Sequence, residues 1–147
     1  MRVIIRVKSK TSSLYSTLSL WEFQSEKIIQ KNRKTLMIKK SIESLPWVES
    51  SHGCGQKRVL LSDNETATNL TQVAIISLKA GEEGKEHMHW KIEEGFYVLK
   101  GELILQADRT NHILHAGDYL HLRMATIHNL KAITDVELLS IGCKIRE

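Results

Sequence analysis

Proline and cysteine are scarce in this sequence of 147 residues, which has one proline and two cysteines. Because Pro46 is the only proline, most turns must be formed by Gly, Asn and Asp. Cys54 and Cys143 lie far apart and outside any CxxC pattern. This spacing predicts reduced thiols and a cytoplasmic location and does not indicate a disulfide framework, although a single Cys54–Cys143 bridge is left open.

Long apolar runs are also missing, and none approaches the roughly 20 residues of a membrane span. Positive charge is concentrated at the start of the chain. Residues 1–36 contain eight Lys or Arg and two acids, a net charge of +6. Residues 37–147 contain thirteen Lys or Arg and fifteen acids, a net charge of −2. The excess of basic residues therefore belongs to the N-terminal segment, and we expect no membrane partner and no nucleic-acid partner.

The sequence predicts two parts: a basic, poorly structured N-terminal extension of residues 1–36, and a folded domain of residues 37–147. Lys, Ser and Thr in the extension offer little apolar surface to offset its ordering entropy. Three alternatives stay open: a presequence of mitochondrial type, a start site assigned too early, and docking of residues 14–23 on the domain or on a partner chain.

From residue 71 onward the sequence reads as short apolar segments separated by turn residues such as Gly101 and Gly117. Regularly spaced short strands of this kind predict an all-β, antiparallel sandwich or barrel. The expected strands are 71–78, 95–99, 102–106, 112–115, 118–123, 128–133 and 136–142. Residues 44–57 are expected to be irregular and to pack Trp47 against the domain.

Two histidines one residue apart, His87 and His89, are the first chemical signal. Residues i and i+2 lie on opposite sides of a helix but on the same face of a strand. If both histidines bind the same metal ion, the segment that carries them must therefore be extended. Glu94 begins the next apolar run on the same face as Phe96 and Val98, where an acid is costly unless it is paired or binds a cation. Glu93 has the opposite parity and is expected to be solvated.

The segment "GEEGKEHMHWKIEEGFYVLKG" resembles the first motif of the cupin superfamily, G-x5-H-x-H-x4-E-x6-G. The matching residues are Gly81, His87, His89, Glu94 and Gly101. "GDYLHLRMATIHNL" resembles the second motif and supplies His128. Together the two motifs span residues 81–129. The second motif departs from the family pattern, because Arg123, Met124 and Ala125 stand where Pro and Gly are usual, and Ala132 stands where Asn is common.

The resemblance implies a double-stranded β-helix, or jelly-roll barrel, that binds one divalent transition metal through His87, His89, Glu94 and His128. Imidazole and carboxylate donors suit Fe, Mn, Ni, Zn, Co or Cu without choosing among them. The other histidines are expected to be ordinary. His52, His112 and His115 are read as solvated, and His121 as pointing outward. If the strand parity were reversed, the face of Tyr119, His121 and Arg123 would line the site.

Similar cupins include dioxygenases, isomerases, epimerases, decarboxylases and binding or regulatory domains. We therefore expect a metal-dependent enzyme that acts on a small polar molecule inside the barrel, with dioxygenase- or isomerase-like chemistry. Lys91 or Arg123 could hold an anionic group at the rim. The alternatives are a non-catalytic cupin that binds or senses a small molecule, and a metal-free scaffold. The resemblance also implies a homodimer. No catalytic residue beyond the ligands can be named.

Overall fold

The computed structural model describes residues 37–145, so the prediction that residues 1–36 are poorly structured lies outside the described residues. The chain divides into two units, residues 1–39 and 40–147, and the description below concerns the second. No helix among residues 37–145 is long and apolar enough to cross a membrane.

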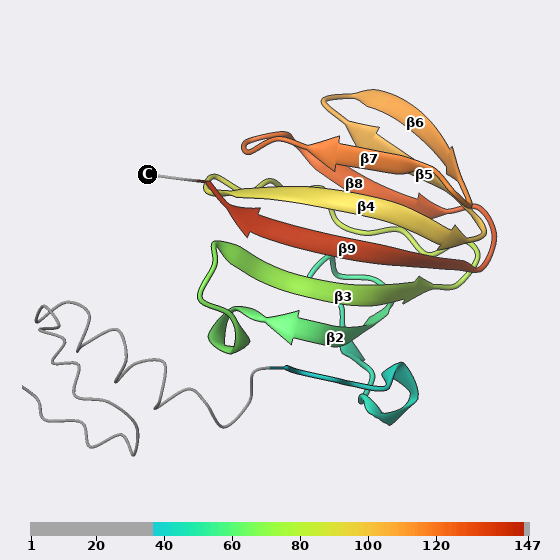
Figure 1. Cartoon of the computed structure of the whole chain (residues 1–147). Coiled ribbons are helices and arrows are strands. Elements are labelled where there is room, and N and C mark those ends of the chain that lie inside the picture. Colours follow the sequence, from blue (N-terminus) through green and yellow to red (C-terminus); the bar gives the residue numbers. More distant parts are fainter. Residues whose placement is uncertain (1–36, 146–147) are drawn as a thin grey trace, which may run out of the picture. The chain divides into compact units, whose positions relative to one another are not determined.

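Within the described residues, nine antiparallel strands make up two sheets (Figure 1). The larger sheet has the order β1-β2-β3-β9-β4-β7, and the smaller sheet has the order β6-β5-β8. The strands are β1 (Val48–Glu49), β2 (Gln56–Ser62), β3 (Leu70–Leu78), β4 (Ile92–Lys100), β5 (Glu102–Ala107), β6 (Thr110–His115), β7 (Tyr119–Leu122), β8 (His128–Ala132) and β9 (Val136–Lys144). Two short 3-10 turns, η1 (Ile42–Ser44) and η2 (Asp63–Glu65), complete the described elements.

Each of the seven predicted strands corresponds to an observed one, and the all-β antiparallel prediction is confirmed. Two parts of the expectation were wrong. Residues 44–57 are not wholly irregular, because they contain β1 and the start of β2. The segment that carries His87 and His89 lies between strands, and an isolated β-bridge joins His87 to His128. The predicted shared face is thus produced by an extended connection instead of a regular strand.

The core lies between the inner faces of the two sheets. Side chains alternate along each strand, so every second residue points into this core, and most of these residues are apolar. Phe96 and Leu138 from the larger sheet are fully buried together with Leu103, Leu105 and Leu130 from the smaller sheet. Both cysteines are free, which agrees with the expected thiols and not with a Cys54–Cys143 bridge.

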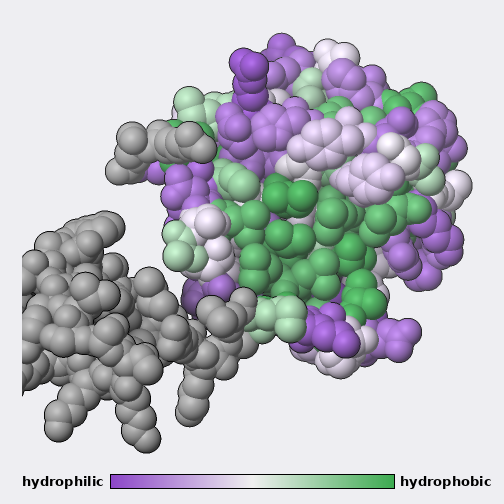
Figure 2. Space-filling view, in the orientation of Figure 1, coloured by the Kyte–Doolittle hydropathy of each residue, from purple (hydrophilic) through white to green (hydrophobic). Residues whose placement is uncertain are grey.

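The outer face of the larger sheet is also apolar along β3, β9 and β4, and Figure 2 shows this area facing the viewer. Ile75, Leu139 and Tyr97 face each other across these three strands. The Tyr119 ring lies over Gly95, where a Cβ atom would overlap its hydroxyl group. Trp47 is half-exposed, with the guanidinium carbon of Arg58 4.3 Å from the centroid of its ring.

Candidate metal centre

Glu94 lies near the start of β4, where the inner row of the larger sheet changes from apolar to polar. Its cross-strand partner on β9 is Gly142, and the cross-strand partner of Gly142 on β3 is Gln72. Glu94 shares its face with Phe96 and Val98, which are almost fully buried, so the predicted parity is confirmed. Gly142 is required by its other neighbour, because a Cβ atom there would lie 2.5 Å from Thr71 Oγ1.

His87 and His89 are held against the second motif by backbone hydrogen bonds. The His87 N–H donates to the His128 carbonyl over 3.0 Å, and the His128 N–H donates to the His87 carbonyl over 2.9 Å. The Ala125 N–H donates to the His89 carbonyl over 2.7 Å. These bonds bring the two sequence motifs together although a long stretch of chain separates them.

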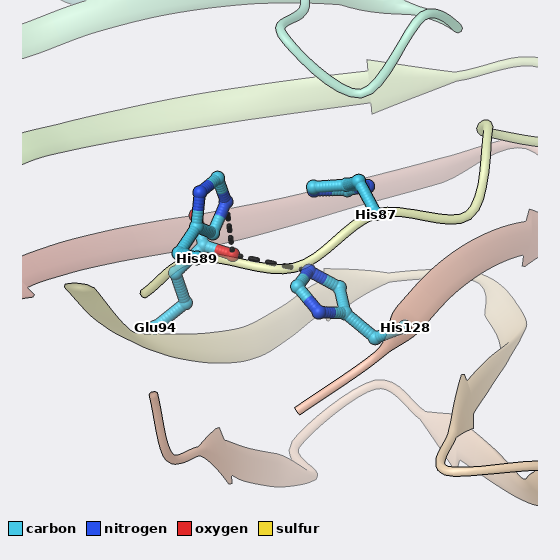
Figure 3. A group of neighbouring side chains, drawn as sticks. All are labelled: His87, His89, Glu94 and His128. Atoms are coloured by element: carbon cyan, nitrogen blue, oxygen red, sulfur yellow. Dashed lines mark ion pairs between the residues drawn. The ribbon is translucent and has the colours of Figure 1, made fainter. Parts of the chain in front are cut away.

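The structure brings all four predicted ligands into one group, with one donor atom from each within 4.8 Å of the others (Figure 3). Glu94 Oε2 lies 3.4 Å from His89 Nε2 and 3.2 Å from His128 Nε2. Donors bound to one ion at about 2.0–2.2 Å are separated by roughly 3 Å when they are adjacent. The two contacts of Glu94 are therefore close to the spacing of adjacent ligands of one ion.

The hydrogen-bond partners of the imidazoles leave their inner nitrogens available. The Nδ1 atoms of His87 and His128 each lie 2.9 Å from a backbone carbonyl, of Lys85 and Thr126 respectively, so each Nδ1 carries a proton and donates it. Backbone carbonyls fix the tautomer of metal-binding histidines in the same way. A neutral His128 then presents the lone pair of Nε2 toward the carboxylate of Glu94.

Two of these inner atoms, His128 Nε2 and Glu94 Oε2, are buried and make no hydrogen bond with acceptable geometry. Two electron-rich atoms 3.2 Å apart in a buried site repel each other unless a proton or a cation lies between them. The group therefore fits a divalent metal by its donor types, its spacing and its unsatisfied atoms.

In the metal-free protein a proton takes this place. Burial alone would lower the pKa of His128, but its contacts with the Glu94 carboxylate and the Thr126 carbonyl outweigh burial, and the pKa is raised. Burial alone would raise the pKa of Glu94, but His128 and the other imidazoles lower it. An ionised Glu94 beside a protonated His128 is thus favoured, and metal binding must release that proton.

A pocket of about 260 Å³ opens beside this group. Glu94, His89, Ser140 and His52 are among its lining residues. Its remaining lining residues are Ser51, Lys57, Thr71, Gln72, Ile76, Ile92 and Gly142. Neither Lys91 nor Arg123, which the sequence suggested as anion-binding residues at the rim, is among the lining residues described.

Glu93 and His121 lie on the outer face, as predicted. Glu93 Oε2 is 3.1 Å from His121 Nε2, and both side chains are partly exposed. His121 is the cross-strand partner of Gly95, which has the same parity as Glu93, so both side chains of the pair are on the face opposite to Glu94. The alternative of reversed parity is therefore excluded. His112 and His115 are exposed on β6, as expected.

The prediction that His52 is a solvated histidine is wrong. Its side chain is only 4% exposed, and its Nδ1 atom lies 3.0 Å from His87 Nε2. His52 lies in the β1–β2 loop, outside both sequence motifs, and no spacing pattern links it to His87. The two glycines that follow it, Gly53 and Gly55, have a positive φ and form a tight turn, whose direction the sequence alone does not reveal.

We expect the metal-free protein to lose stability as the pH falls from about 6.5 to 4. Burial lowers the pKa of His52 to about 4; Glu94 opposes this shift, and the imidazoles of His87, His128 and His89 add to it. The unfolded chain then binds more protons in this window, so acid favours unfolding, by at most roughly 3 kcal/mol. The raised pKa of His128 acts in the opposite sense, because its stabilisation is lost as the pH rises.

Urea unfolding of chelator-treated protein at several pH values measures this dependence. His52→Phe should flatten the profile between pH 6.5 and 4, since it removes the titrating group and keeps a ring in the site. His112→Phe, at an exposed position, should leave the profile unchanged. A profile that is equally steep in the His52 variant contradicts the assignment.

The turn before His128 contains a strained residue. Ala125 has a φ of 63°, in the left-handed region that costs a residue with a Cβ roughly 1 kcal/mol. The sequence pattern showed only that the usual Pro and Gly are missing here, and the structure shows that the left-handed position remains. The hydrogen bond from Ala125 to His89 holds the turn in this conformation.

We therefore expect Ala125→Gly to raise the free energy of unfolding by about 0.5–1 kcal/mol, since glycine adopts this φ without strain. Urea denaturation of the metal-free protein measures the gain. The control is Ala116→Gly, at an exposed turn position without a positive φ. It should lose stability by a similar amount. Equal losses in both variants would show that Ala125 is not strained.

Comparisons with known proteins agree with this geometry. Residues 74–142 match the family model described as Cupin domain. A predicted oxalate decarboxylase from Thermotoga maritima is similar in structure, with a TM-score of 0.67 and 19% identity over 74% of this chain and 100% of that one. Ectoine synthase from P. lautus gives a TM-score of 0.64 with 18% identity, over 73% of this chain and 78% of that one.

A RmlC-like cupin from Shewanella frigidimarina is 22% identical, with a TM-score of 0.62, over 76% of this chain and 94% of that one. No curated protein sequence matches. At these identities the structural likeness shows the fold and leaves the reaction undetermined. The family match, the two antiparallel sheets and the similar structures together show that the chain contains a small cupin domain.

Proposed function

We propose that the protein binds one divalent transition metal through His87, His89, Glu94 and His128 and acts as a metal-dependent enzyme on a small acidic molecule. The observation that carries the proposal is the pair of buried, unsatisfied atoms, Glu94 Oε2 and His128 Nε2, inside a group of four donors. When bound, such a metal supplies Lewis-acid or redox chemistry at the positions that the protein leaves open.

The charges of the pocket support an anionic substrate. A divalent ion with one carboxylate and neutral imidazoles keeps a net positive charge. Lys57 adds another, because it faces inward in the row of Ile76 and Leu138 and lines the pocket. No ion pair of Lys57 is found within residues 37–145. Ser51, Thr71 and Gln72 supply polar groups beside it.

The residues that line the pocket would have different roles toward the substrate. Lys57 would bind the acidic group of the substrate, and Ser140 and Gln72 would orient its polar atoms. Ile76 would keep water from the wall of the pocket, because it is buried and lines the pocket. The pocket volume of about 260 Å³ suits a molecule of a few carbon atoms.

The experiment for metal binding is elemental analysis of protein produced in metal-supplemented medium, followed by titration of the chelator-treated protein. We expect close to one first-row divalent ion per chain, with affinity that rises with pH because a proton must leave His128. Absence of bound metal together with absence of uptake on titration would disprove the proposal.

Replacing Lys57 tests the anionic substrate. We expect Lys57→Met to weaken binding of small carboxylates to the metal-loaded protein by about 10-fold, roughly 1.4 kcal/mol, since it removes the charge and keeps the side-chain length. Calorimetry with a panel of mono- and dicarboxylates provides the measurement. Lys79→Met is the matched control, because Lys79 is exposed and paired with Asp135. Equal binding by both variants would refute the role of Lys57.

A binding or sensing protein without turnover is the second candidate. One observation favours it: apart from the proposed metal ligands, His52 and Lys57 are the only ionisable side chains among the described pocket residues. The pocket thus lacks a separate acid–base pair. Loss of a bound carboxylate over time, followed by NMR with the metal-loaded protein, distinguishes the enzyme from a binding protein.

A further inference from the structure

We infer that His52 is a fifth protein ligand of the metal, an inference that rests on the metal site proposed above. His52 precedes the first motif and belongs to the loop between β1 and β2. It is buried, lines the pocket and directs Nδ1 at His87 Nε2 over 3.0 Å. Its ring is about as far from that of His128 as the His89 ring is, with centroid separations of 6.2 and 5.9 Å.

The backbone on both sides holds His52 in place. Its N–H donates to Ser50 Oγ over 3.2 Å, and its carbonyl accepts from the Lys85 N–H over 3.0 Å. The loop packs closely on Gly84, where a Cβ atom would lie 3.0 Å from the His52 carbonyl oxygen and 3.2 Å from Cys54 Sγ. The β1–β2 loop is thus fastened to the residues that lead into His87, and the imidazole enters the site from a fixed position.

The hydrogen-bond partners of the two rings imply that His52 responds to the metal. His87 donates from Nδ1 to the Lys85 carbonyl, so its Nε2 lone pair is the acceptor for a proton on His52 Nδ1. A metal bound at His87 Nε2 takes that lone pair, and His52 then has no acceptor. Moving the proton of His52 from Nδ1 to Nε2, by exchange with water, frees the Nδ1 lone pair for the same ion. The net charge of the side chain does not change.

The distance between His52 and His87 agrees with a shared ion. Two nitrogens about 2.1 Å from one metal and at right angles are separated by about 3.0 Å. His52 Nδ1 and His87 Nε2 have this separation, and the contacts of Glu94 with His128 and His89 are only slightly longer. Five protein ligands would leave one position of an octahedron open instead of two. The substrate would then coordinate through a single atom, with Lys57 holding its other end.

Cobalt(II) binding to the full-length protein tests the inference, because the visible absorption of cobalt(II) reports the number of its ligands. Cobalt affinity is measured by competition with a chromophoric chelator. We expect His52→Phe to weaken cobalt binding by about 10- to 100-fold and to change the visible spectrum. His112→Phe, at an exposed position on β6, should match the wild type in both measurements.

The outcomes separate the two proposals. If the wild type takes up no cobalt, the metal site fails and the role of His52 fails with it. If the wild type binds cobalt and His52→Phe binds equally or more tightly with an unchanged spectrum, only the role of His52 is overturned. Circular dichroism confirms folding of each variant. Should the Phe variant not fold, His52→Gln, which is smaller and polar, takes its place with the same expected changes.

Discussion

Replacing Glu94 with Gln is expected to weaken metal binding by about 100- to 1000-fold, or roughly 3–4 kcal/mol. The carboxylate is the only negatively charged donor of the group, and its Oε2 atom is buried against His89 and His128. An amide keeps one oxygen but loses the charge that offsets a divalent ion. It also leaves a buried N–H₂ group to be satisfied among imidazole nitrogens. Competition with a chelator of known affinity, at constant pH, gives the change directly.

Glu93→Gln is the matched control for this experiment. Glu93 is adjacent in sequence and chemically identical, but it lies on the outer face and pairs with His121. An exposed pair of this kind contributes at most about 1 kcal/mol to folding and should not affect the metal. Similar losses of affinity in the two variants would mean that the parity of β4 does not select the ligand.

Gly101→Ala is expected to lower the free energy of unfolding by roughly 3–5 kcal/mol, enough to prevent folding in many domains of this size. Gly101 joins β4 to β5 with a φ of 85°, which a residue with a Cβ adopts only with strain. The added Cβ would also overlap the backbone carbonyl of Asp135 and lie 2.9 Å from Thr134 Oγ1. A backbone carbonyl cannot move aside as a side chain can, so the turn itself must shift. Urea denaturation or the yield of folded protein measures the loss.

Gly117→Ala isolates the contribution of the clash. Gly117 also has a positive φ, 98°, but no atom lies within 4 Å of the position that a Cβ would take. Its replacement should therefore cost only the backbone strain, about 1–2 kcal/mol. If the two variants lose the same stability, close contact with residues 134–135 does not explain the glycine at position 101.

Much of the fold and the candidate ligand group could be predicted because both depend on local periodicity. Alternation along the apolar run that forms β4 is enough to assign Glu94 to the inner face and Glu93 to the outer face. The spacing of His87 and His89 required an extended backbone. The motif resemblance added His128, which no local pattern connects to the other three. The role of these residues as ligands stays a prediction, as do the homodimer and the cytoplasmic location.

The features that were missed depend on contacts between distant segments. β2 was not predicted because its basic start, Gln56 to Arg58, hides the apolar residues that follow. Lys57 consequently had no assigned face, and its place in the pocket could not be inferred. His52 reaches His87 only because the β1–β2 loop folds onto Gly84 and Lys85. The turn at Ala125 was missed for a local reason. Alanine disfavours the left-handed conformation, so the residue type gave no indication of the turn that is observed.

The paired backbone hydrogen bonds between His87 and His128 determine when, during folding, the ligand group can exist. These residues are far apart in the sequence, and closing so long a segment is entropically costly until the neighbouring strands have formed. The four donors therefore converge late, after β4 has joined the larger sheet and β8 the smaller one. A nascent or unfolded chain offers only scattered imidazoles, which bind ions weakly. Ion uptake thus marks chains that have completed folding, and it lengthens the lifetime of the folded state without accelerating its formation.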